Sequence, residues 1–316
     1  MKIGNPPLVT VFGGGGFVGR YVCEYLLKAG ARVRVAQRSP KSAYFLQPLG
    51  QVGQIQFANA DVNRPDSVAL AVSGADAVVN LVSVFGRAMQ RVNGVGAGIV
   101  AEEAAKAGAG ALVQVSAIGA DPAGPADYAK SKAAGEANAR KAFPKATIIR
   151  PSLVFGPEDQ LTNRFASLLA MLPTYPVIAP KTKFQPVYVR DLGRAIASAA
   201  LDPKTHGGKT YEIGGPDVLT MRALTAEIGR LAGQDTGLID LPDVAAAGMA
   251  KLGFLPGAPL TWDQWLMLKK DKVASGKNGL AAFGIEPTPL DAVAGEWLGR
   301  FREGGRFAAR ATPLDA

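Results

Sequence analysis

Cysteine and histidine are each present only once among the 316 residues of this chain. The single cysteine, Cys23, excludes an internal disulfide framework and a cysteine-rich zinc site. The single histidine, His206, excludes Ser-His-Asp and Cys-His catalysis unless His206 itself is the base. It stands between Pro203-Lys-Thr and Gly-Gly, a setting that is typical of a turn. The chemistry of this protein therefore has to come from other residue types, and no metal site is expected.

Long apolar runs are also missing. No uncharged apolar stretch reaches the ~18–20 residues that a membrane span needs, and no apolar segment of a signal peptide follows Met1. The apolar fraction of 48% and the charged fraction of 19% exclude a disordered chain. We expect a soluble, cytoplasmic protein, and peripheral association with a membrane stays open.

The charge is basic and unevenly distributed. The chain has 35 Lys and Arg against 26 Asp and Glu, and nearly all of the excess lies in residues 1–150. Such an excess is either a solvated surface or a surface for polyanions, namely cofactor phosphates, anionic lipid or an acidic partner. No basic run is interleaved with aromatic residues, so we expect no nucleic-acid partner.

The first half of the sequence alternates between strand and helix patterns. Apolar or alternating runs predict strands, and stretches with helical spacing separate them. This alternation predicts an α/β fold with a Rossmann-like, doubly wound parallel sheet. The predicted strands are 8–12, 32–36, 55–58, 77–81, 111–115 and 147–150, and the predicted helices are 17–29, one from residue 66, one ending near 108, and 128–143.

The second half is less regular. It predicts strands at 185–189 and 209–213, a helix capped by Asp191 up to about Leu201, and a helix capped by Thr220 up to Ala232. Residues 290–301 form an amphipathic pattern. We expect two domains, a nucleotide-binding domain over 1–150 and a smaller lobe over 151–316 that closes over the cofactor cleft.

A glycine-rich turn joins the first predicted strand to the first predicted helix. Gly13, Gly16 and Gly19 permit a tight turn, close approach of the backbone to a pyrophosphate and close packing of helix on strand. Phe17 and Val18 open the helix, whose N-terminal N–H groups suit phosphates. The Gly-x-x-Gly-x-x-Gly spacing resembles the extended and atypical short-chain dehydrogenase/reductase families.

The end of the second predicted strand indicates which nucleotide binds. NAD enzymes of this superfamily usually carry a carboxylate there, whereas this chain has Gln37-Arg38-Ser39. A guanidinium at Arg38, assisted by Lys41, suits adenine stacking and a 2′-phosphate, so NADPH is preferred over NADH. The resemblance further places Asp61 and Val62 at the adenine. It places Asn80 and Leu81 along the cofactor cleft.

A Tyr-x-x-x-Lys pair stands on the helix predicted at 128–143. Tyr128 and Lys132 lie four residues apart and so share one helix face, and this spacing occurs at no other tyrosine of the chain. Ser116 ends the fifth strand, where the resemblance places the catalytic serine. An ammonium beside a phenol is expected to lower the tyrosine pKa, so that Tyr128 can exchange a proton during hydride transfer. Alternatively, the pair only binds cofactor or packs.

Further stretches resemble the family of NADPH-binding accessory subunits of respiratory complex I and their bacterial relatives. They are Phe143 to Asp159, Asn163 to Ser167, Gln185 to Asp191 and Gly284 to Leu290, and the Arg150-Pro151 turn is shared with sugar epimerases. The resemblance implies a cofactor contact at Pro151 and a tightly held NADPH that serves stability or assembly more than turnover. It also implies docking on peripheral-arm subunits of complex I, at the cytoplasmic face of the inner membrane in a bacterium or the matrix side in a mitochondrion.

Three functions follow from these patterns. The first is an NADPH-holding accessory or assembly subunit of NADH:quinone oxidoreductase. The second is an active NADPH-dependent reductase, or a nucleotide-sugar epimerase or dehydratase, that uses Ser116, Tyr128 and Lys132 on a small-molecule substrate. The third is a redox-sensing regulator, which would be expected to have lost the Tyr-Lys pair that this chain keeps.

Overall fold

A computed structural model describes residues 6–253, 260–302 and 305 of the chain, which divides into two compact units. Unit 1 comprises the residues up to Pro151 together with Val189–Ile213 and Ala274–Glu286. Unit 2 comprises Ser152–Tyr188, Gly214–Val273 and the residues from Pro287 onward. The chain therefore passes between the units after residues 151, 188, 213, 273 and 286.

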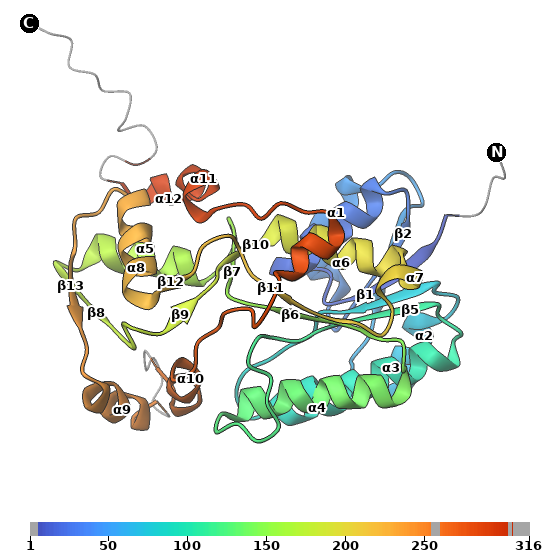
Figure 1. The fold of residues 1–316 in the computed structure, drawn as a ribbon. Coiled ribbons are helices and arrows are strands. Elements are labelled where there is room, and N and C mark those ends of the chain that lie inside the picture. Colours follow the sequence, from blue (N-terminus) through green and yellow to red (C-terminus); the bar gives the residue numbers. More distant parts are fainter. Residues whose placement is uncertain (1–5, 254–259, 303–304, 306–316) are drawn as a thin grey trace, which may run out of the picture. The chain divides into compact units, whose positions relative to one another are not determined.

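Unit 1 is built on a seven-stranded sheet in which every neighbouring pair of strands is parallel (Figure 1). The central strands β1, β4 and β5 are mostly apolar, as expected where helices cover both faces of a sheet. The order reverses at β1, which lies between β2 and β4, and such a reversal is where doubly wound sheets bind ligands. From one edge, the strands are β3 (Ile55–Asn59), β2 (Arg32–Gln37), β1 (Leu8–Phe12), β4 (Ala77–Asn80), β5 (Ala111–Val115), β6 (Thr147–Pro151) and β11 (Thr210–Ile213).

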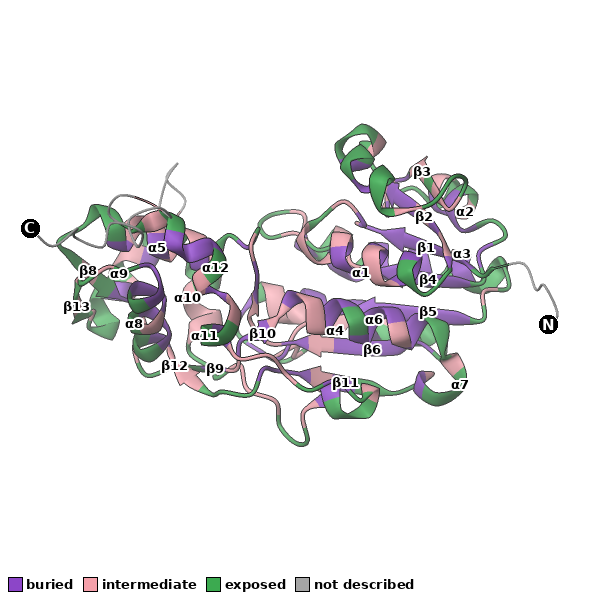
Figure 2. Ribbon diagram, turned by 90° about the horizontal axis from the view of Figure 1, so that it is seen from above, coloured by how far each residue is buried: buried purple, intermediate pink, exposed green. Residues whose placement is uncertain are grey.

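Helices α1 (Phe17–Lys28) and α6 (Val189–Leu201) cover one face of this sheet, and α2 (Pro65–Val72), α3 (Ala97–Lys106) and α4 (Asp127–Ala142) cover the other (Figure 1). The central strands β1, β4 and β5 are buried along their whole length (Figure 2). A Cβ at Gly193 would come within 2.9 Å of the Tyr21 Cβ, so this glycine lets α6 approach α1 closely.

Two irregular helical segments and two short elements complete unit 1. They are the 3-10 segment η1 (Pro40–Leu49), the π-helical segment η2 (Gln90–Gly96), α7 (Pro203–His206) and the 3-10 segment η3 (Gly279–Phe283). π-Helical turns are rare and occur frequently at functional sites. Segment η2 packs on α4, where a Cβ at Gly135 would lie 2.1 Å from the Asn93 carbonyl oxygen.

Unit 2 has its own core of buried side chains from α5 (Leu161–Met171), α8 (Met221–Leu231) and the segment from Leu290. Its strands form three short pairs: β7 (Val154–Phe155) with β10 (Val187–Tyr188), β9 (Lys183–Phe184) with β12 (Leu219–Thr220), and β8 (Thr174–Val177) with β13 (Gly237–Asp240). The remaining helices are α9 (Asp243–Lys251), α10 (Trp262–Leu268), α11 (Leu290–Val293), α12 (Gly295–Leu298) and the 3-10 turn η4 (Gly299–Phe301).

The expected α/β class and the doubly wound parallel sheet are confirmed. Thr220 caps α8 as predicted, because its hydroxyl accepts a hydrogen bond from the Ala223 N–H at 3.1 Å. Asp191 is not a cap, since α6 already begins at Val189 and Asp191 lies in its first turn. Within 185–189 only Val187 and Tyr188 are strand.

Residues 290–301 are three short helical pieces rather than one amphipathic helix. The second and third pieces begin at Gly295 and Gly299, and glycine costs ~1 kcal/mol relative to alanine inside a helix. His206 is buried in unit 1, where its ring stacks on Phe283 and its Nδ1 lies 2.9 Å from the Tyr211 hydroxyl. These contacts make His206 a packing residue.

Among the described residues, no helix combines the length and the apolar composition of a membrane span. The same residues contain no group of three or more His, Cys, Asp or Glu side chains placed to hold a metal ion.

Candidate nucleotide-binding and catalytic site

The glycine turn between β1 and α1 is closed by its own backbone. Gly13 has a φ of +78°, which favours glycine, and its carbonyl accepts a hydrogen bond from the Gly16 N–H at 3.0 Å. A Cβ at Gly19 would lie 2.2 Å from the Gly13 oxygen, so α1 approaches the turn at a distance that no side chain permits. Gly13 and Gly19 thus fulfil the turn and packing roles that their spacing predicts, and the approach of a pyrophosphate to this backbone stays a prediction.

The N-terminus of α1 offers uncapped N–H groups. Its cap residue, Gly16, has no side chain, and no acidic residue stands in the first turn, where Phe17 and Val18 are half-buried. A helix start of this kind carries a partial positive charge and free donors, which suit a pyrophosphate.

The carboxamide of Gln37 fixes the same turn to the following segment. Its Oε1 accepts a hydrogen bond from the Gly15 N–H at 3.1 Å, and its Nε2 donates to the Ser39 carbonyl and the Ser42 hydroxyl at 2.7 and 2.8 Å. Sequence reasoning missed this role. The one available signal was the amide that stands where NAD enzymes carry a carboxylate.

Arg38 and Lys41 are both exposed, at the end of β2 and the start of η1. The adjacent strand β3 brings Asp61 near Arg38. Hydrogen bonds from Asn63 and then the positive charges of Arg38 and Arg91 hold the Asp61 pKa below its ordinary value. The structure therefore brings together the two positions that were expected at the adenosine end, and it adds Arg91, which no motif had indicated. Val62 is buried beside Gly96 of η2.

The end of β4 lies beside the glycine turn, as expected for a cleft wall. The Leu81 N–H donates to the Phe12 carbonyl at 3.0 Å, and a Cβ at Gly13 would meet Leu81 at 3.6 Å. Asn80 is buried, and its amide donates to the Gln114 Oε1 at 2.8 Å while its oxygen accepts from the Val82 N–H. Asn80 thus shapes the loop that follows it.

Helix α4 and the end of β5 assemble the predicted catalytic residues. The Lys132 ammonium lies 5.8 Å from the centre of the Tyr128 ring and donates to the Val115 carbonyl at 3.3 Å. Ser116 follows Val115 directly, and its hydroxyl is buried without a hydrogen-bond partner among the described residues. An unsatisfied buried hydroxyl costs free energy, which fits a group that bonds a substrate or cofactor oxygen.

The protonation of this pair differs from expectation. Burial raises the Tyr128 pKa above its ordinary value, a hydrogen bond with Ser83 opposes the change, and Lys132 contributes no resolved effect. The expected lowering by the lysine is therefore wrong for the protein alone, because desolvation of the phenol outweighs a cation over its ring. Burial lowers the Lys132 pKa to about 8, against the attraction of Glu136.

Two residues that sequence reasoning missed hold the surroundings of Tyr128. The exposed Phe85 ring stacks on the Tyr128 ring, with centres 4.5 Å apart. Asn93, on the π-helical segment η2, accepts from the Val84 N–H and donates to the Val84 carbonyl, both at 2.9 Å, and its amide also bonds Ser131. The loop after β4 is thereby fixed to α4. No short motif marks either residue.

Pro151 ends β6 as a buried residue, and its carbonyl accepts from the Ile118 N–H at 2.9 Å, two residues beyond Ser116.

The only cysteine, Cys23, is buried beneath Gly14, and burial raises its thiol pKa to about 12. A thiol of this kind is unreactive, so Cys23 supports the turn by packing.

Residues 9–214 match the model of the NAD dependent epimerase/dehydratase family, and the chain belongs to this family. The match covers the sheet of unit 1 and the whole site described above.

Comparison with curated proteins places the chain more narrowly. It is 33% identical to the mitochondrial NADH dehydrogenase (ubiquinone) 1 alpha subcomplex subunit 9 of Arabidopsis thaliana over 94% of this chain and 79% of the relative. It is 33% identical to the subunit of the same name from Rattus norvegicus over 93% and 80%. Within the broader family, the chain thus belongs with the 1 alpha subcomplex subunit 9 proteins, and the resemblance drawn from the motifs is confirmed.

Solved structures share the fold at lower identity. The NADPH-dependent quinone oxidoreductase QOR2 of Escherichia coli, solved with NADPH, superimposes with a TM-score of 0.74 at 21% identity, over 91% of this chain and 99% of that one. The triphenylmethane reductase of Citrobacter sp., solved with NADP(H), gives 0.74 at 18% identity over 92% and 99%. At these identities the likeness supports the fold.

Proposed function

We propose that this protein is an NADPH-binding accessory or assembly subunit of an NADH:quinone oxidoreductase, in which the nucleotide stays bound. The observation that carries the proposal is the similarity to subunits of that enzyme along 94% of the chain. The uncapped start of α1 and the side-chain-free turn before it supply the matching nucleotide site.

Each part of the nucleotide has a candidate partner in unit 1. The pyrophosphate would lie on the turn from Gly13 to Gly19, the adenosine between Arg38 and Asp61, and the nicotinamide ribose at Lys132. When bound, NADPH can supply a hydride. The residues of the chain bind and orient the nucleotide and hold a proton at the Tyr128 hydroxyl. We assign the surface for a partner or substrate to residues 151–316.

A test of this function starts from native membranes. The untagged protein is extracted with a gentle detergent, separated on native gels and analysed by mass spectrometry together with the nucleotide it releases. We expect co-migration with the oxidoreductase and release of NADP(H). Migration apart from the oxidoreductase at every detergent concentration would exclude the subunit role. A protein released without nucleotide would exclude the cofactor.

The second candidate function is an NADPH-dependent reductase, with a nucleotide-sugar epimerase or dehydratase as a related possibility. It is favoured by the unsatisfied Ser116 hydroxyl and by the placement of the Lys132 ammonium over the Tyr128 ring. The same purified protein distinguishes the two functions. Carbonyl and quinone oxidants consume the bound NADPH in a reductase, whereas the absorbance of the nucleotide persists in a structural subunit.

Substitution of Arg38 is predicted to separate the two nucleotides. Arg38→Ala removes an exposed guanidinium that suits the 2′-phosphate, a group that NADH lacks. Loss of a charge-assisted contact costs on the order of 1.5–3 kcal/mol, so NADPH binding should weaken about 10- to 150-fold and NADH binding far less. Isothermal calorimetry with both nucleotides measures the difference.

Lys141→Ala, which removes an exposed cation in the last turn of α4, is the matched control and should leave both affinities unchanged. Equal losses for NADPH and NADH in the Arg38 variant would refute a 2′-phosphate contact at this position.

A further inference from the structure

Glu136 lies one helical turn after Lys132 on α4 and is held by an arginine from the sheet. Arg150 on β6 donates from Nε to the Glu136 Oε1 at 2.8 Å and from Nη2 to Oε2 at 2.6 Å. The carboxylate is buried, and both of its oxygens are engaged by the fork of one guanidinium. A bidentate pair of this kind fixes direction as well as distance.

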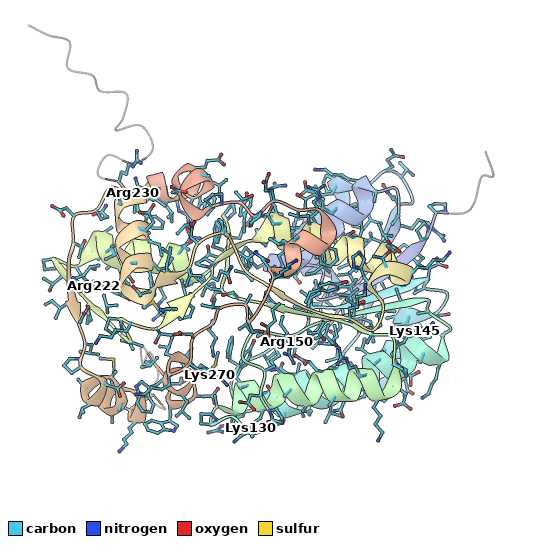
Figure 3. All side chains as sticks on the ribbon, in the orientation of Figure 1. Lys130, Lys145, Arg150, Arg222, Arg230 and Lys270 are labelled. Carbon is cyan, nitrogen blue, oxygen red and sulfur yellow. The ribbon has the colours of Figure 1, made fainter. Side chains whose placement is uncertain are left out.

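The same arginine reaches a second carboxylate. Its Nη1 lies 3.5 Å from the Glu212 Oε1 on β11. The other oxygen of Glu212 accepts hydrogen bonds from the N–H and the hydroxyl of Ser275, both at 2.8 Å. Figure 3 labels Arg150 in its place above α4 in that view. The four residues form one continuous polar chain within unit 1.

This chain of contacts joins three of the points where the polypeptide passes between the units. Arg150 precedes the passage after Pro151, Glu212 precedes the one after Ile213, and Ser275 follows the one after Val273. Each residue lies within two positions of its passage. A change of backbone position at any of these three passages would therefore change the position of the Glu136 carboxylate.

We propose that Arg150 is a positioning residue for Lys132, because it holds Glu136 beside that lysine and ties both to three of the passages between the units. The proposal rests on the proposed function, in which Lys132 would hold the nicotinamide ribose, and it adds that Arg150 controls the position of Lys132. Its first test requires no nucleotide and so does not depend on that function.

Glu136 and Arg150 carry opposite charges, and Glu136 is the one of the two with a resolved effect on Lys132. The ammonium lies over the Tyr128 ring on its own helix and donates to the Val115 carbonyl of β5, and the negative charge of Glu136 attracts it. Among the described residues, Glu136 is the charged group with a resolved effect on Lys132. Removing the anion therefore favours the neutral amine, whereas removing the arginine leaves the anion unbalanced and favours the ammonium.

The first test is an NMR titration of Lys132 in the nucleotide-free protein, with carbon-13 at the lysine ε positions and the signal assigned by its loss in a Lys132→Arg variant. The wild type should titrate with a pKa of about 8. Glu136→Gln should lower the midpoint and Arg150→Met should raise it, each by at least about 0.5 unit. Shifts in the same direction in both variants, or no shift in either, would overturn the proposal, because general loosening of the fold acts in one direction.

Arg150→Lys provides the conservative comparison with Arg150→Met. An ammonium keeps the positive charge but lacks the fork that spans two carboxylates. The midpoint should return towards the wild-type value. A midpoint equal to that of a folded Arg150→Met variant would contradict a charge effect at this position.

The second test is amide hydrogen exchange with and without NADPH. In the wild type, NADPH should protect the amides of residues 212–213 and 274–276 as well as those of α4. Arg150→Lys should still bind NADPH, yet it should lose at least half of the protection at the two distant segments. Full protection there would overturn the link to the passages. Absence of NADPH binding by the wild type would instead refute the proposed function and leave the titration result valid.

Discussion

Gly19→Ala is expected to weaken NADPH binding at least about 100-fold. The added Cβ would lie 2.2 Å from the Gly13 carbonyl oxygen and 2.7 Å from the Gly14 backbone, so the turn itself has to move. Overpacking of this kind costs ~1–3 kcal/mol, and a turn displaced from the start of α1 also loses its phosphate geometry. Calorimetric titration with NADPH measures the affinity, and thermal melting measures the stability.

A matched control is Gly248→Ala on helix α9, where a Cβ would meet nothing within 4 Å. Alanine is the better helix former, so this variant should bind NADPH normally and be as stable as the wild type or slightly more so. If Gly19→Ala binds NADPH with wild-type affinity, the turn is not the pyrophosphate site.

Lys132→Met is expected to stabilise the protein at neutral pH while it weakens NADPH binding. Lys132 is 5% exposed, and its pKa falls from 10.5 to about 8 because burial penalises the ammonium. Below pH 8 the folded state therefore bears the full cost of the buried charge, on the order of 3 kcal/mol, and methionine removes it. Urea unfolding at pH 7 measures the gain.

The sign of its pH dependence follows from linkage. Between pH 8 and 10.5 the unfolded lysine keeps a proton that the folded one has lost, so the stability of the wild type rises with pH relative to the variant. The advantage of Lys132→Met should accordingly shrink over this range. Lys130→Met, on the same helix (Figure 3) with a side chain that is 42% exposed, should show neither the gain nor its pH dependence. A loss of stability at pH 7 in Lys132→Met would contradict a buried charge.

Local patterns predicted most of unit 1 correctly. The mostly apolar runs at 8–12 and 111–115 are the strands β1 and β5 residue for residue, because a strand covered on both faces favours a nearly continuous apolar sequence. The glycine spacing predicted the turn, because only residues without a side chain fit between Gly13 and α1. The family resemblance came from the same kind of short-range information.

Contacts between residues that are distant in the sequence could not be predicted from local patterns. The run at 209–213 was expected in a second domain, yet Thr210–Ile213 is strand β11 at the edge of the first sheet, paired with β6. The role of Gln37 at the turn and that of Asn93 at the loop after β4 depend on residues 22 and 9 positions away. Neither contact corresponds to a periodic pattern in the sequence.

The sequence by itself determined the class of fold, the glycine turn and the pairing of Tyr128 with Lys132, because each depends on neighbours within one strand, turn or helix. Only the tertiary structure decided the charge state of that pair. Burial, which raises the Tyr128 pKa and lowers that of Lys132, is a property of the surrounding helices and strands. The tertiary structure likewise decided that four residues meet, namely Glu136, Arg150, Glu212 and Ser275. They lie up to 139 positions apart, from 136 to 275, and only the folded sheet brings them into contact.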